Sequence, residues 1–294
     1  MADTEAMKIL VLGASGMMGN TILQVFNAEP GLRTLGTVRS DAARDRLPAA
    51  LRDKVIVGVD AQDLQGIDAL LRDHQPQAVI NCIGVVKQLP EASDPLVTIP
   101  LNAVFPHQLA RLCEKHGARL VHLSTDCVFD GKGSMYTETD FASADDLYGR
   151  AKFLGEVDYP HAITLRTSTI GHELGHRHGL LEWFLSQEQE VGGFTRAMYS
   201  GLSTIEFARV ILDMVLPRPD LHGLLQVSGD AISKYDLLVL IRQIYGRSTP
   251  IRRNDAFSID RTLDSTRFRT ATGYRPPSWH DQILEMYRAH QGSN

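Results

Sequence analysis

The chain has 294 residues, enough for one large α/β domain or for such a domain with a smaller appended lobe. Its net charge of −5 and its interleaved acidic and basic residues exclude a Lys/Arg-rich face, which argues against a nucleic-acid partner. No apolar run reaches the roughly eighteen residues of a membrane span. The acidic start of the chain does not resemble a signal peptide. The three cysteines have no metal-binding or redox spacing, which fits a reducing compartment. We therefore expect a cytoplasmic protein without nucleic-acid or membrane partners.

Six short strands rich in β-branched residues are predicted in the first part of the chain, at residues 8–13, 33–38, 54–59, 77–83, 118–124 and 162–167. Amphipathic helical patterns lie between them, for example at 64–73 and 104–116. The strands are apolar throughout rather than alternating, which is typical of a sheet covered on both faces. Repeated units of this kind predict an α/β fold with a Rossmann-type, doubly wound parallel sheet that binds ligands at its strand ends.

The pattern changes after residue 167. Glycine becomes frequent, and helical patterns such as 204–215 and 233–245 follow one another with less strand between them. We predict an NAD(P)-binding domain over residues 1–167 and a smaller C-terminal substrate-binding lobe over residues 168–294. The boundary is soft, because segments of the second range can return to the main domain.

A glycine-rich loop connects the first predicted strand to the first helical pattern. Glycines at this point permit a sharp turn, a close approach of the backbone to a pyrophosphate and tight helix–strand packing. The helix N-terminus adds N–H groups and the positive end of the helix dipole. An ordinary strand–helix turn is the alternative interpretation. The context predicts a dinucleotide site formed by Gly13, Ser15, Gly16, Met17, Met18 and Gly19.

Arg39 follows the second predicted strand, about twenty residues beyond the glycines, where an NAD site usually has an acidic residue. A guanidinium suits a 2′-phosphate, so the predicted cofactor is NADPH, with NADH as the alternative. Arg39 also fits an ordinary solvated arginine. Asp60, after the third predicted strand, is either an adenine contact or a residue that caps a turn.

Three side chains suited to carbonyl reduction follow the fifth predicted strand. Thr125 lies at the strand end, and Tyr148 and Lys152 lie one turn apart on a helix that begins after capping residues at 143–146. A phenol with a free pKa of about 10 is a poor acid at neutral pH, and a neighbouring ammonium lowers that pKa. Tyr-x-x-x-Lys alone also fits an ordinary amphipathic helix. Its position after the glycine loop and Thr125 favours catalysis.

Three segments resemble the extended short-chain dehydrogenase/reductases, and within that group the dTDP-4-dehydrorhamnose reductase-like proteins. They are Gly13 to Gly19, Ser124-Thr125-Asp126-Cys127-Val128-Phe129-Asp130-Gly131, and Tyr148-Gly149-Arg150-Ala151-Lys152-Phe153-Leu154-Gly155-Glu156. The tail from Leu263 to Trp279 is also similar, so the likeness covers nearly the whole chain. It implies hydride transfer from NADPH to the keto carbon of a nucleotide-linked 4-keto-6-deoxy sugar. Tyr148 would donate the proton, Lys152 would orient the ribose, and Thr125 would bind the carbonyl oxygen.

The same resemblance implies further contacts and a homodimer. Residues expected along the cofactor are Asn81, Cys82, Ile83, Ser124, Thr167 and Ser168, besides Tyr148 and Lys152, and residues expected to face the substrate are Val85, Val86 and Phe129, besides Thr125 and Tyr148. Two departures leave the identity of the sugar open. Cys127 replaces an aromatic residue, and Thr169 stands where many rhamnose-pathway reductases carry Trp.

A second motif, His172-Glu173-Leu174-Gly175-His176, fits the zinc-peptidase pattern H-E-x-x-H, which works only on a helix. Glycines at 171, 175 and 179 disfavour a helix, since each costs about 1 kcal/mol relative to alanine. A third histidine is absent from the position where many such peptidases have one. We therefore predict a glycine-rich loop near the substrate entrance, with no functional metal. A weak adventitious metal site and, more remotely, a zinc peptidase are the alternatives.

Two other functions use the same scaffold. A regulatory subunit that binds the cofactor without turnover has no chemical need for Thr125, Tyr148 and Lys152. An epimerase or dehydratase would retain NAD, and a dehydratase would want an acid/base pair beside Thr125, where Asp126 is not followed by Glu. The residues therefore favour an NAD(P)-dependent reductase.

Overall fold

The main sheet of the protein has seven parallel strands. The computed structural model describes residues 6–175 and 177–292, and the strand order of this sheet is β10-β6-β5-β4-β1-β2-β3. In chain order its strands are β1 (Met7–Leu12), β2 (Leu32–Val38), β3 (Val55–Val57), β4 (Ala78–Asn81), β5 (Arg119–Thr125), β6 (Ala162–Thr167) and β10 (Gly223–Gln226). The order reverses between β1 and β4, and doubly wound sheets bind ligands at the carboxyl ends of the strands beside such a point.

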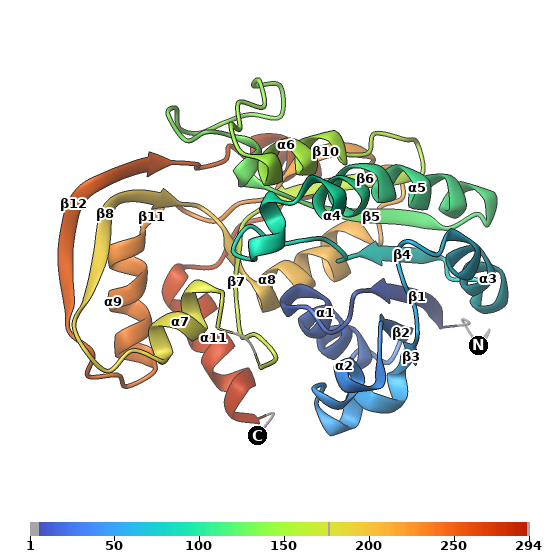
Figure 1. Cartoon of the computed structure of the whole chain (residues 1–294), viewed down its shortest axis with the longest axis horizontal. Helices are drawn as coiled ribbons and strands as arrows, with labels where there is room; N and C mark the ends of the chain where they lie inside the picture. Colours follow the sequence, from blue (N-terminus) through green and yellow to red (C-terminus); the bar gives the residue numbers. More distant parts are fainter. Residues whose placement is uncertain (1–5, 176, 293–294) are drawn as a thin grey trace.

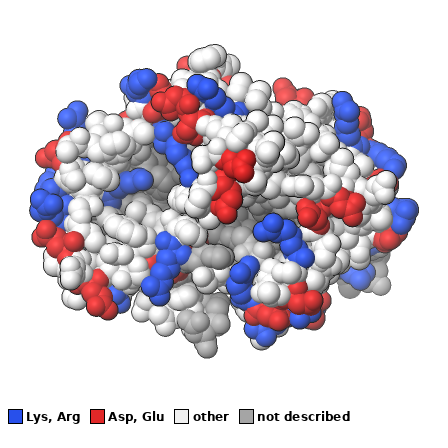
Figure 2. All heavy atoms as spheres, viewed as in Figure 1, with Lys and Arg blue, Asp and Glu red and all other residues white. Residues whose placement is uncertain are grey.

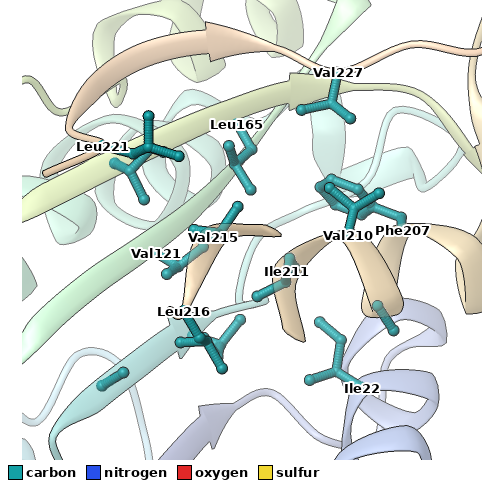
Figure 3. Close-up of a cluster of buried hydrophobic side chains, with 14 of the residues drawn as sticks. Ile22, Val121, Leu165, Phe207, Val210, Ile211, Val215, Leu216, Leu221 and Val227 are labelled. Carbon is teal, nitrogen blue, oxygen red and sulfur yellow. The ribbon is translucent and has the colours of Figure 1, made fainter. Parts of the chain in front are cut away.

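Helices cover both faces of this sheet (Figure 1). One face carries α1 (Met17–Asn27), α8 (Thr204–Arg209) and η5 (Val210–Val215), and the other carries α3 (Leu64–His74) and α5 (Phe105–Lys115). Figure 3 shows the first of these interfaces, where Ile22 of α1 and Ile211 of η5 lie close to Val121 and Leu165 of the strands. Each fully buried side chain of this size contributes roughly 1.5–3 kcal/mol, so the two helical layers hold the strand ends firmly.

Local sequence patterns predicted this domain well. The six predicted strands correspond to β1 to β6, with boundaries shifted by no more than two residues. The predicted helices at 64–73 and 104–116 are confirmed as α3 and as the end of η3 followed by α5. The helix predicted at 204–215 is α8, which continues as the π-helical segment η5, and the helix predicted at 233–245 is α9 (Lys234–Ile244). The doubly wound Rossmann fold is thus confirmed.

A second, smaller sheet lies beside the main one. Its order is β11-β8-β12: β8 (Val191–Tyr199) pairs antiparallel with β11 (Ile232–Ser233) and parallel with β12 (Ile251–Asp260). Helices α7 (Leu180–Leu185), α9 and α11 (Trp279–Gly292) supply its apolar core. The sequence did not predict β8 or β12. β8 contains two adjacent glycines and most of β12 is exposed, so neither has the continuous apolar pattern of a main-sheet strand.

Residues beyond 167 contribute to both parts of the molecule. β10 pairs with β6 at the edge of the main sheet, and α8 and η5 pack on that sheet, whereas β8, β11 and β12 build the small one. Two short strands, β7 (Thr169–Ile170) and β9 (Leu202–Ser203), pair with each other. The chain therefore leaves the main domain after β6, forms part of the small lobe, and returns at α8.

The remaining helical segments are short. They are α2 (Asp41–Asp45), η1 (Ala49–Lys54), η2 (Pro90–Ser93), α4 (Pro95–Thr98), η3 (Ile99–Val104), η4 (Asp126–Val128), α6 (Leu147–Leu154) and α10 (Thr266–Thr272). Across the described part of the chain, none of the helices has both the length and the apolarity that crossing a membrane requires. Figure 2 shows acidic and basic side chains interspersed on one face, with lysines and arginines along a hollow between the small lobe and the main domain.

Candidate active site

The loop between β1 and α1 has the backbone geometry of a dinucleotide-binding turn. Gly13 has a φ of +82°, and a Cβ on Gly19 would lie 2.2 Å from the Gly13 carbonyl oxygen, so both positions require glycine. A Cβ on Gly16, the N-cap of α1, would meet only the Gly13 carbonyl, at 3.5 Å, and no side chain caps this helix. Ser15, Met17 and Met18 are half-buried around this position. The N-terminus of α1 can therefore receive an anionic group.

Arg39 and Asp60 lie beyond the ends of the neighbouring strands β2 and β3. Arg39 is exposed and precedes Ser40, whose side chain caps α2. Asp60 is also exposed, and one of its carboxylate oxygens accepts the Gln62 N–H at 2.9 Å. Asp60 had two interpretations, an adenine contact or a residue that caps a turn, and this hydrogen bond supports the second. Arg39 is the exposed basic side chain that directly follows β2.

The loop after β4 packs against the glycine loop. A Cβ on Gly13 would lie 3.1 Å from Ile83 Cγ1 and 3.2 Å from the Cys82 carbonyl carbon, so the two segments are in contact. Asn81 is buried and uses both ends of its amide: Oδ1 accepts the Ile83 N–H at 3.1 Å, and Nδ2 lies 3.1 Å from His122 Nδ1. The Asn81 side chain therefore shapes this loop, rather than pointing toward a ligand.

Val85 and Val86 differ in accessibility. Val85 is 7% exposed, and its N–H and carbonyl bind the side-chain amide of Asn102 at 2.9 and 3.0 Å. Val86 is 44% exposed. Lys87 forms an ion pair of 2.5 Å with Asp146, which ties this loop to the start of α6. Of the two valines predicted to face a substrate, Val86 has the accessible side chain.

β5 ends at Thr125, on the carboxyl edge of the sheet. Its Oγ1 accepts the Cys127 N–H and donates to Asp126 Oδ1, both at 3.1 Å, so the hydroxyl caps the short helix η4. Asp126 is buried, and burial raises the pKa of its carboxyl group, an effect that the Arg261 guanidinium opposes. The strand end therefore holds a hydroxyl in a fixed position beside a buried carboxyl group.

Helix α6 begins at the predicted capping residues. The Asp146 carboxylate accepts the Gly149 N–H at 2.8 Å. A Cβ on Gly149 would lie 2.2 Å from the Cys127 carbonyl oxygen, so only glycine lets α6 approach the residues after β5 so closely. This approach brings the Tyr148 phenol beside Thr125, whose side chain acts on the phenol's pKa.

The phenol of Tyr148 differs from its predicted state. Burial raises its pKa above the ordinary value of 10.0, the nearby Cys127 acts in the same direction, and the hydrogen bond with Thr125 opposes both. The sequence predicted that Lys152 would lower this pKa. That prediction is wrong for this structure, because burial raises the pKa of the phenol, while the Lys152 ammonium donates to the Leu123 carbonyl at 2.7 Å. Tyr148 is accordingly protonated over the whole neutral range.

Lys152 is buried on the same side of α6. It is 7% exposed, and burial lowers its pKa from 10.5 to about 8, while Glu156 and Cys82 act in the opposite direction. The spacing of four residues predicted that Tyr148 and Lys152 share one helix face, and both lie toward the end of β5. The structure thus brings Thr125, Tyr148 and Lys152 together.

Ser124 was predicted to contact the cofactor, but its hydroxyl points into a buried ion pair. Its Oγ donates to Glu156 Oε1 at 2.7 Å. Both oxygens of Glu156 also bind Arg166, through Nε and Nη2, each at 2.7 Å. Ser124 is 6% and Arg166 is 1% exposed, so this cluster lies inside the domain. Sequence reasoning missed it, although an arginine inside an otherwise apolar strand is a sign of a buried partner.

Phe129 was predicted to face the substrate, and the structure corrects this prediction. Its side chain is fully buried and packs with Val128 and Leu263. One ring face stacks on Tyr136, with centroids 4.1 Å apart, and the Arg166 guanidinium lies 5.1 Å from the ring centroid. No part of the ring is left for a ligand to contact.

Thr167 and Ser168 end β6 next to Thr125. Thr167 is buried and aligned with Thr125 across the two strands, and its Oγ1 donates to the Ser168 carbonyl at 3.3 Å. Basic residues from the second half of the chain also approach this edge. Arg261 donates to the Phe129 carbonyl at 2.7 Å, and both Arg261 and Lys234 act electrostatically on Asp126. No local pattern around these two residues could have predicted that position.

The segment that matches H-E-x-x-H is not helical where the structure describes it, at residues 171–175 and 177–179. His176 lies outside the described residues. His172 uses both ring nitrogens: Nδ1 lies 2.6 Å from Glu182 Oε1, and Nε2 lies 2.9 Å from the Tyr245 hydroxyl. Among the described side chains, no group of three or more His, Cys, Asp or Glu residues is arranged to hold a metal ion. The prediction of a loop is confirmed.

Similarity along the whole chain decides the family. The family model described as RmlD substrate binding domain matches residues 7–291. The chain belongs to this family. The match runs from β1 to α11 of this RmlD-family chain, so it includes the glycine loop, Thr125, Tyr148 and Lys152 as well as the small sheet.

The RmlD-family chain is also similar to curated proteins over part of their length. It is 30% identical to the probable low-salt glycan biosynthesis reductase Agl14 of Haloferax volcanii, over 56% of this chain and 54% of that protein. It is 29% identical to methionine adenosyltransferase 2 subunit beta of Mus musculus, over 51% of this chain and 41% of that protein. The chain therefore spans about half the length of these relatives or less.

A solved structure shows that the fold is shared. The dTDP-4-dehydrorhamnose reductase of Bacillus anthracis str. Ames, in complex with NADP, has a TM-score of 0.80 to this RmlD-family chain, with 17% identity. The alignment covers 97% of this chain and 99% of that one. At this identity the similarity establishes the architecture of both sheets and no more.

Proposed function

We propose that the protein is an NADPH-dependent reductase of a nucleotide-linked 4-keto-6-deoxy sugar. One observation carries the proposal: three side chains meet at the carboxyl end of β5. The Tyr148 phenol lies beside the Thr125 side chain, which acts on its pKa. One turn further along α6, the Lys152 ammonium donates to the Leu123 carbonyl of β5. A half-buried phenol beside a strand-end hydroxyl is suited to donate a proton to a carbonyl oxygen.

The residues have distinct roles in this reaction. Bound NADPH supplies a hydride to the keto carbon. Thr125 hydrogen-bonds the carbonyl oxygen and polarises the C=O bond. Tyr148, kept protonated by burial, transfers its proton to that oxygen as the C–H bond forms, so the ketone becomes an alcohol. Lys152 would bind the ribose hydroxyls of the cofactor through its ammonium and so position the cofactor relative to the phenol.

The chain contains the residues that such a cofactor needs. The open N-terminus of α1 suits the pyrophosphate, because no side chain caps that helix and Gly16 leaves the space in front of it clear. Arg39 would bind the 2′-phosphate and so favour NADPH over NADH. Cys82 and Ile83, which touch the glycine loop, would lie along the dinucleotide, and Thr167 and Ser168 would lie near the nicotinamide.

The relatives support a reductase and also raise an alternative. One of them is a probable glycan biosynthesis reductase, and another is a methionine adenosyltransferase subunit. The second similarity is the reason to test for cofactor binding without turnover. The presence of Thr125, Tyr148 and Lys152 in one site favours catalysis, because binding alone requires no proton donor.

The test is NADPH oxidation, followed by absorbance, with a panel of nucleotide-linked 4-keto-6-deoxy sugars that differ in base and sugar. The reductase is expected to oxidise NADPH with at least one of them and to release the alcohol. NADPH binding without turnover on any sugar would favour the regulatory role. NAD that stays bound through purification, with exchange of sugar stereochemistry, would favour the epimerase.

We also infer that residues 168–294 supply most of the substrate contacts.

We further infer that the protein forms a homodimer. Elements α4, η3 and α6 contact one another and form a surface with exposed apolar side chains. These side chains are Leu96, Ile99, Phe153 and Leu154, which are 82, 39, 43 and 62% exposed. A second copy would cover this surface. Sedimentation should show a dimer for the natural chain and a monomer for Leu154→Glu, and a monomeric natural chain would contradict the inference.

A further inference from the structure

One buried carboxylate, that of Glu156, connects three parts of the candidate site. Glu156 follows the end of α6, four residues after Lys152. Its Oε1 accepts hydrogen bonds from Ser124 Oγ and Arg166 Nε, and its Oε2 accepts from Arg166 Nη2, all at 2.7 Å. The side chain is 7% exposed. It therefore ties the end of α6 to β5 and β6 at once.

The contacts of Glu156 lie next to those of Lys152. Lys152 donates to the main-chain carbonyl of Leu123, and Glu156 accepts from the side chain of Ser124, the next residue of β5. The following residue is Thr125. Helix α6, which carries Tyr148 and Lys152, is thus fastened by two adjacent hydrogen bonds to the strand end that holds the third residue of the site.

The guanidinium of Arg166 donates hydrogen bonds to the Glu156 carboxylate through both Nε and Nη2. Arg166 is 1% exposed, its guanidinium lies over the ring of Phe129, and its Nη1 has no hydrogen-bond partner among the described residues. A charge buried this deeply requires a paired opposite charge, which Glu156 provides. The pair in turn holds the Glu156 side chain in one position.

Three ionisable groups interact electrostatically with Lys152 within the described part of the chain. They are Glu156 just beyond the end of its helix, Cys82 after β4 and His122 on β5. Burial raises the pKa of Cys82 to about 12 and lowers that of His122 well below 6.5, so both are neutral near pH 7, as is Tyr148. Glu156 is therefore the anionic neighbour of the ammonium.

We propose that Glu156 is a positioning residue, which keeps Lys152 protonated and holds α6 against the end of β5, with Arg166 fixing the carboxylate in place. The link between Glu156 and Lys152 is a property of the folded chain. Its importance for turnover rests on the proposed reductase function. The carboxylate touches neither substrate nor cofactor, and it acts through the lysine.

The test measures the protonation of Lys152 directly in the ligand-free protein. Trace labelling with acetic anhydride over a range of pH, read by mass spectrometry of the peptide that contains Lys152, gives the midpoint at which the amine becomes reactive. The midpoint in the natural chain should be near the pKa of about 8. In Glu156→Gln it should fall by about one pH unit, because the neutral amide no longer favours the ammonium.

Three further variants separate the effect of charge from an effect on folding. Glu156→Gln leaves Arg166 buried without its partner, so the double variant Glu156→Gln/Arg166→Gln removes both charges. Its midpoint should lie below that of the natural chain, because the carboxylate is gone, and above that of Glu156→Gln, because no unpaired guanidinium remains. Arg166→Gln alone keeps the carboxylate and should not lower the midpoint. Glu156→Asp should restore part of the shift, because it retains a negative charge.

The matched control is Glu206→Gln on α8, which covers the other face of the sheet. Glu206 is also 7% exposed, and its Oε1 accepts the Tyr274 hydroxyl at 2.9 Å, so the substitution changes a comparable buried carboxylate away from α6. In Glu206→Gln, the pH midpoint for labelling of Lys152 should equal that of the natural chain. Equal midpoints in the natural chain and the double variant would overturn the proposal.

Turnover is measured separately, so that the two proposals can fail independently. If the chain reduces a keto sugar, the alkaline fall of kcat/KM should move to lower pH in the double variant, whereas a purely structural loss would lower kcat/KM equally at every pH. If no sugar is reduced and NADPH does not bind, the reductase proposal fails. The labelling result still decides the link between Glu156 and Lys152.

Discussion

The Lys152 ammonium lies 2.7 Å from the main-chain oxygen of Leu123, so the lysine of α6 binds the strand that ends in Thr125. This contact places the ammonium near the phenol without directing it at the phenol. The protonation state of Tyr148 is consequently set by burial and by Thr125. The contact joins helix α6 to β5, so the phenol, the hydroxyl and the ammonium lie at the same end of the strand.

The proposed activity should fall as the pH rises through about 8, the pKa to which burial lowers Lys152. Below this pH the lysine is an ammonium that can bind ribose hydroxyls as a cation, and above it the amine loses that charge. The measurement is kcat/KM, together with the Kd for NADPH, across neutral and alkaline pH. In Lys152→Arg the group stays charged, so the remaining activity should lack this alkaline fall. A natural enzyme with constant kcat/KM across this pH range would show that Lys152 is not the group responsible.

Replacing Tyr148 with phenylalanine should abolish most turnover and preserve cofactor binding. Only the proton donor is lost, and general acid catalysis is typically worth about 100- to 10,000-fold. The Kd for NADPH should stay within about twofold of the natural value. Tyr287→Phe on α11 is the matched control and should retain the natural rate, because that ring packs edge-on against Tyr245 in the small lobe. A Tyr148→Phe enzyme with nearly natural kcat would end the proposed mechanism.

Substituting alanine for Arg39 should weaken NADPH binding much more than NADH binding. A hydrogen bond to a charged group contributes roughly 1.5–3 kcal/mol, which corresponds to about 10- to 100-fold in Kd for the phosphorylated cofactor. Fluorescence titration with both nucleotides measures the two affinities. Arg33→Ala, an exposed arginine near the start of the same strand, should change neither. Equal losses for NADPH and NADH in the Arg39 variant would show that the guanidinium does not bind a 2′-phosphate.

Shortening Phe129 to leucine should lower stability and leave KM for the sugar unchanged. The ring is fully buried between Tyr136 and Arg166, so its loss leaves a cavity that costs about 1–2 kcal/mol. Urea unfolding measures this difference. Phe141→Leu, at a side chain that is 85% exposed, should change the free energy of unfolding by less than about 0.5 kcal/mol. A large increase in KM with unchanged stability would restore the substrate contact that the structure contradicts.

The sequence predicted those parts of the site that depend on neighbouring residues along the chain. A spacing of four residues placed Tyr148 and Lys152 on one helix face, and a continuous apolar strand placed Thr125 at the carboxyl edge of the sheet. Strand and helix periodicities depend on neighbouring residues only, so a short stretch of sequence is enough to predict them. The same reasoning found the six strands β1 to β6.

Errors arose where a side chain's direction depends on distant partners. The hydroxyl of Ser124 binds Glu156, which lies 32 residues further along. The prediction for Phe129 was wrong for the same reason, because the Phe129 ring packs against the guanidinium of Arg166, which lies on the separate strand β6. Arg261 reaches the Phe129 carbonyl from 132 residues away. Such contacts exist only after the sheet has assembled, so no window of the sequence contains them.

Placing alanine at Gly149 should both destabilise the protein and slow turnover. The new Cβ would lie 2.2 Å from the Cys127 carbonyl oxygen and 2.5 Å from the Ala144 Cβ, so α6 would have to move away from the end of β5. Overpacking of this kind costs about 1–3 kcal/mol, which thermal or urea unfolding measures. The movement would also separate Tyr148 from Thr125, so kcat should fall even under conditions where the variant is fully folded.

The matched control for this last prediction is Gly31→Ala. A Cβ at Gly31 would meet nothing within 4 Å, and the backbone there is not left-handed, so stability should stay unchanged or rise slightly. The contrast between the two alanine variants isolates the helix–strand approach from the general effect of removing a glycine. If Gly149→Ala were fully folded and as active as the natural chain, the close packing of α6 on the residues after β5 would not be what places the phenol.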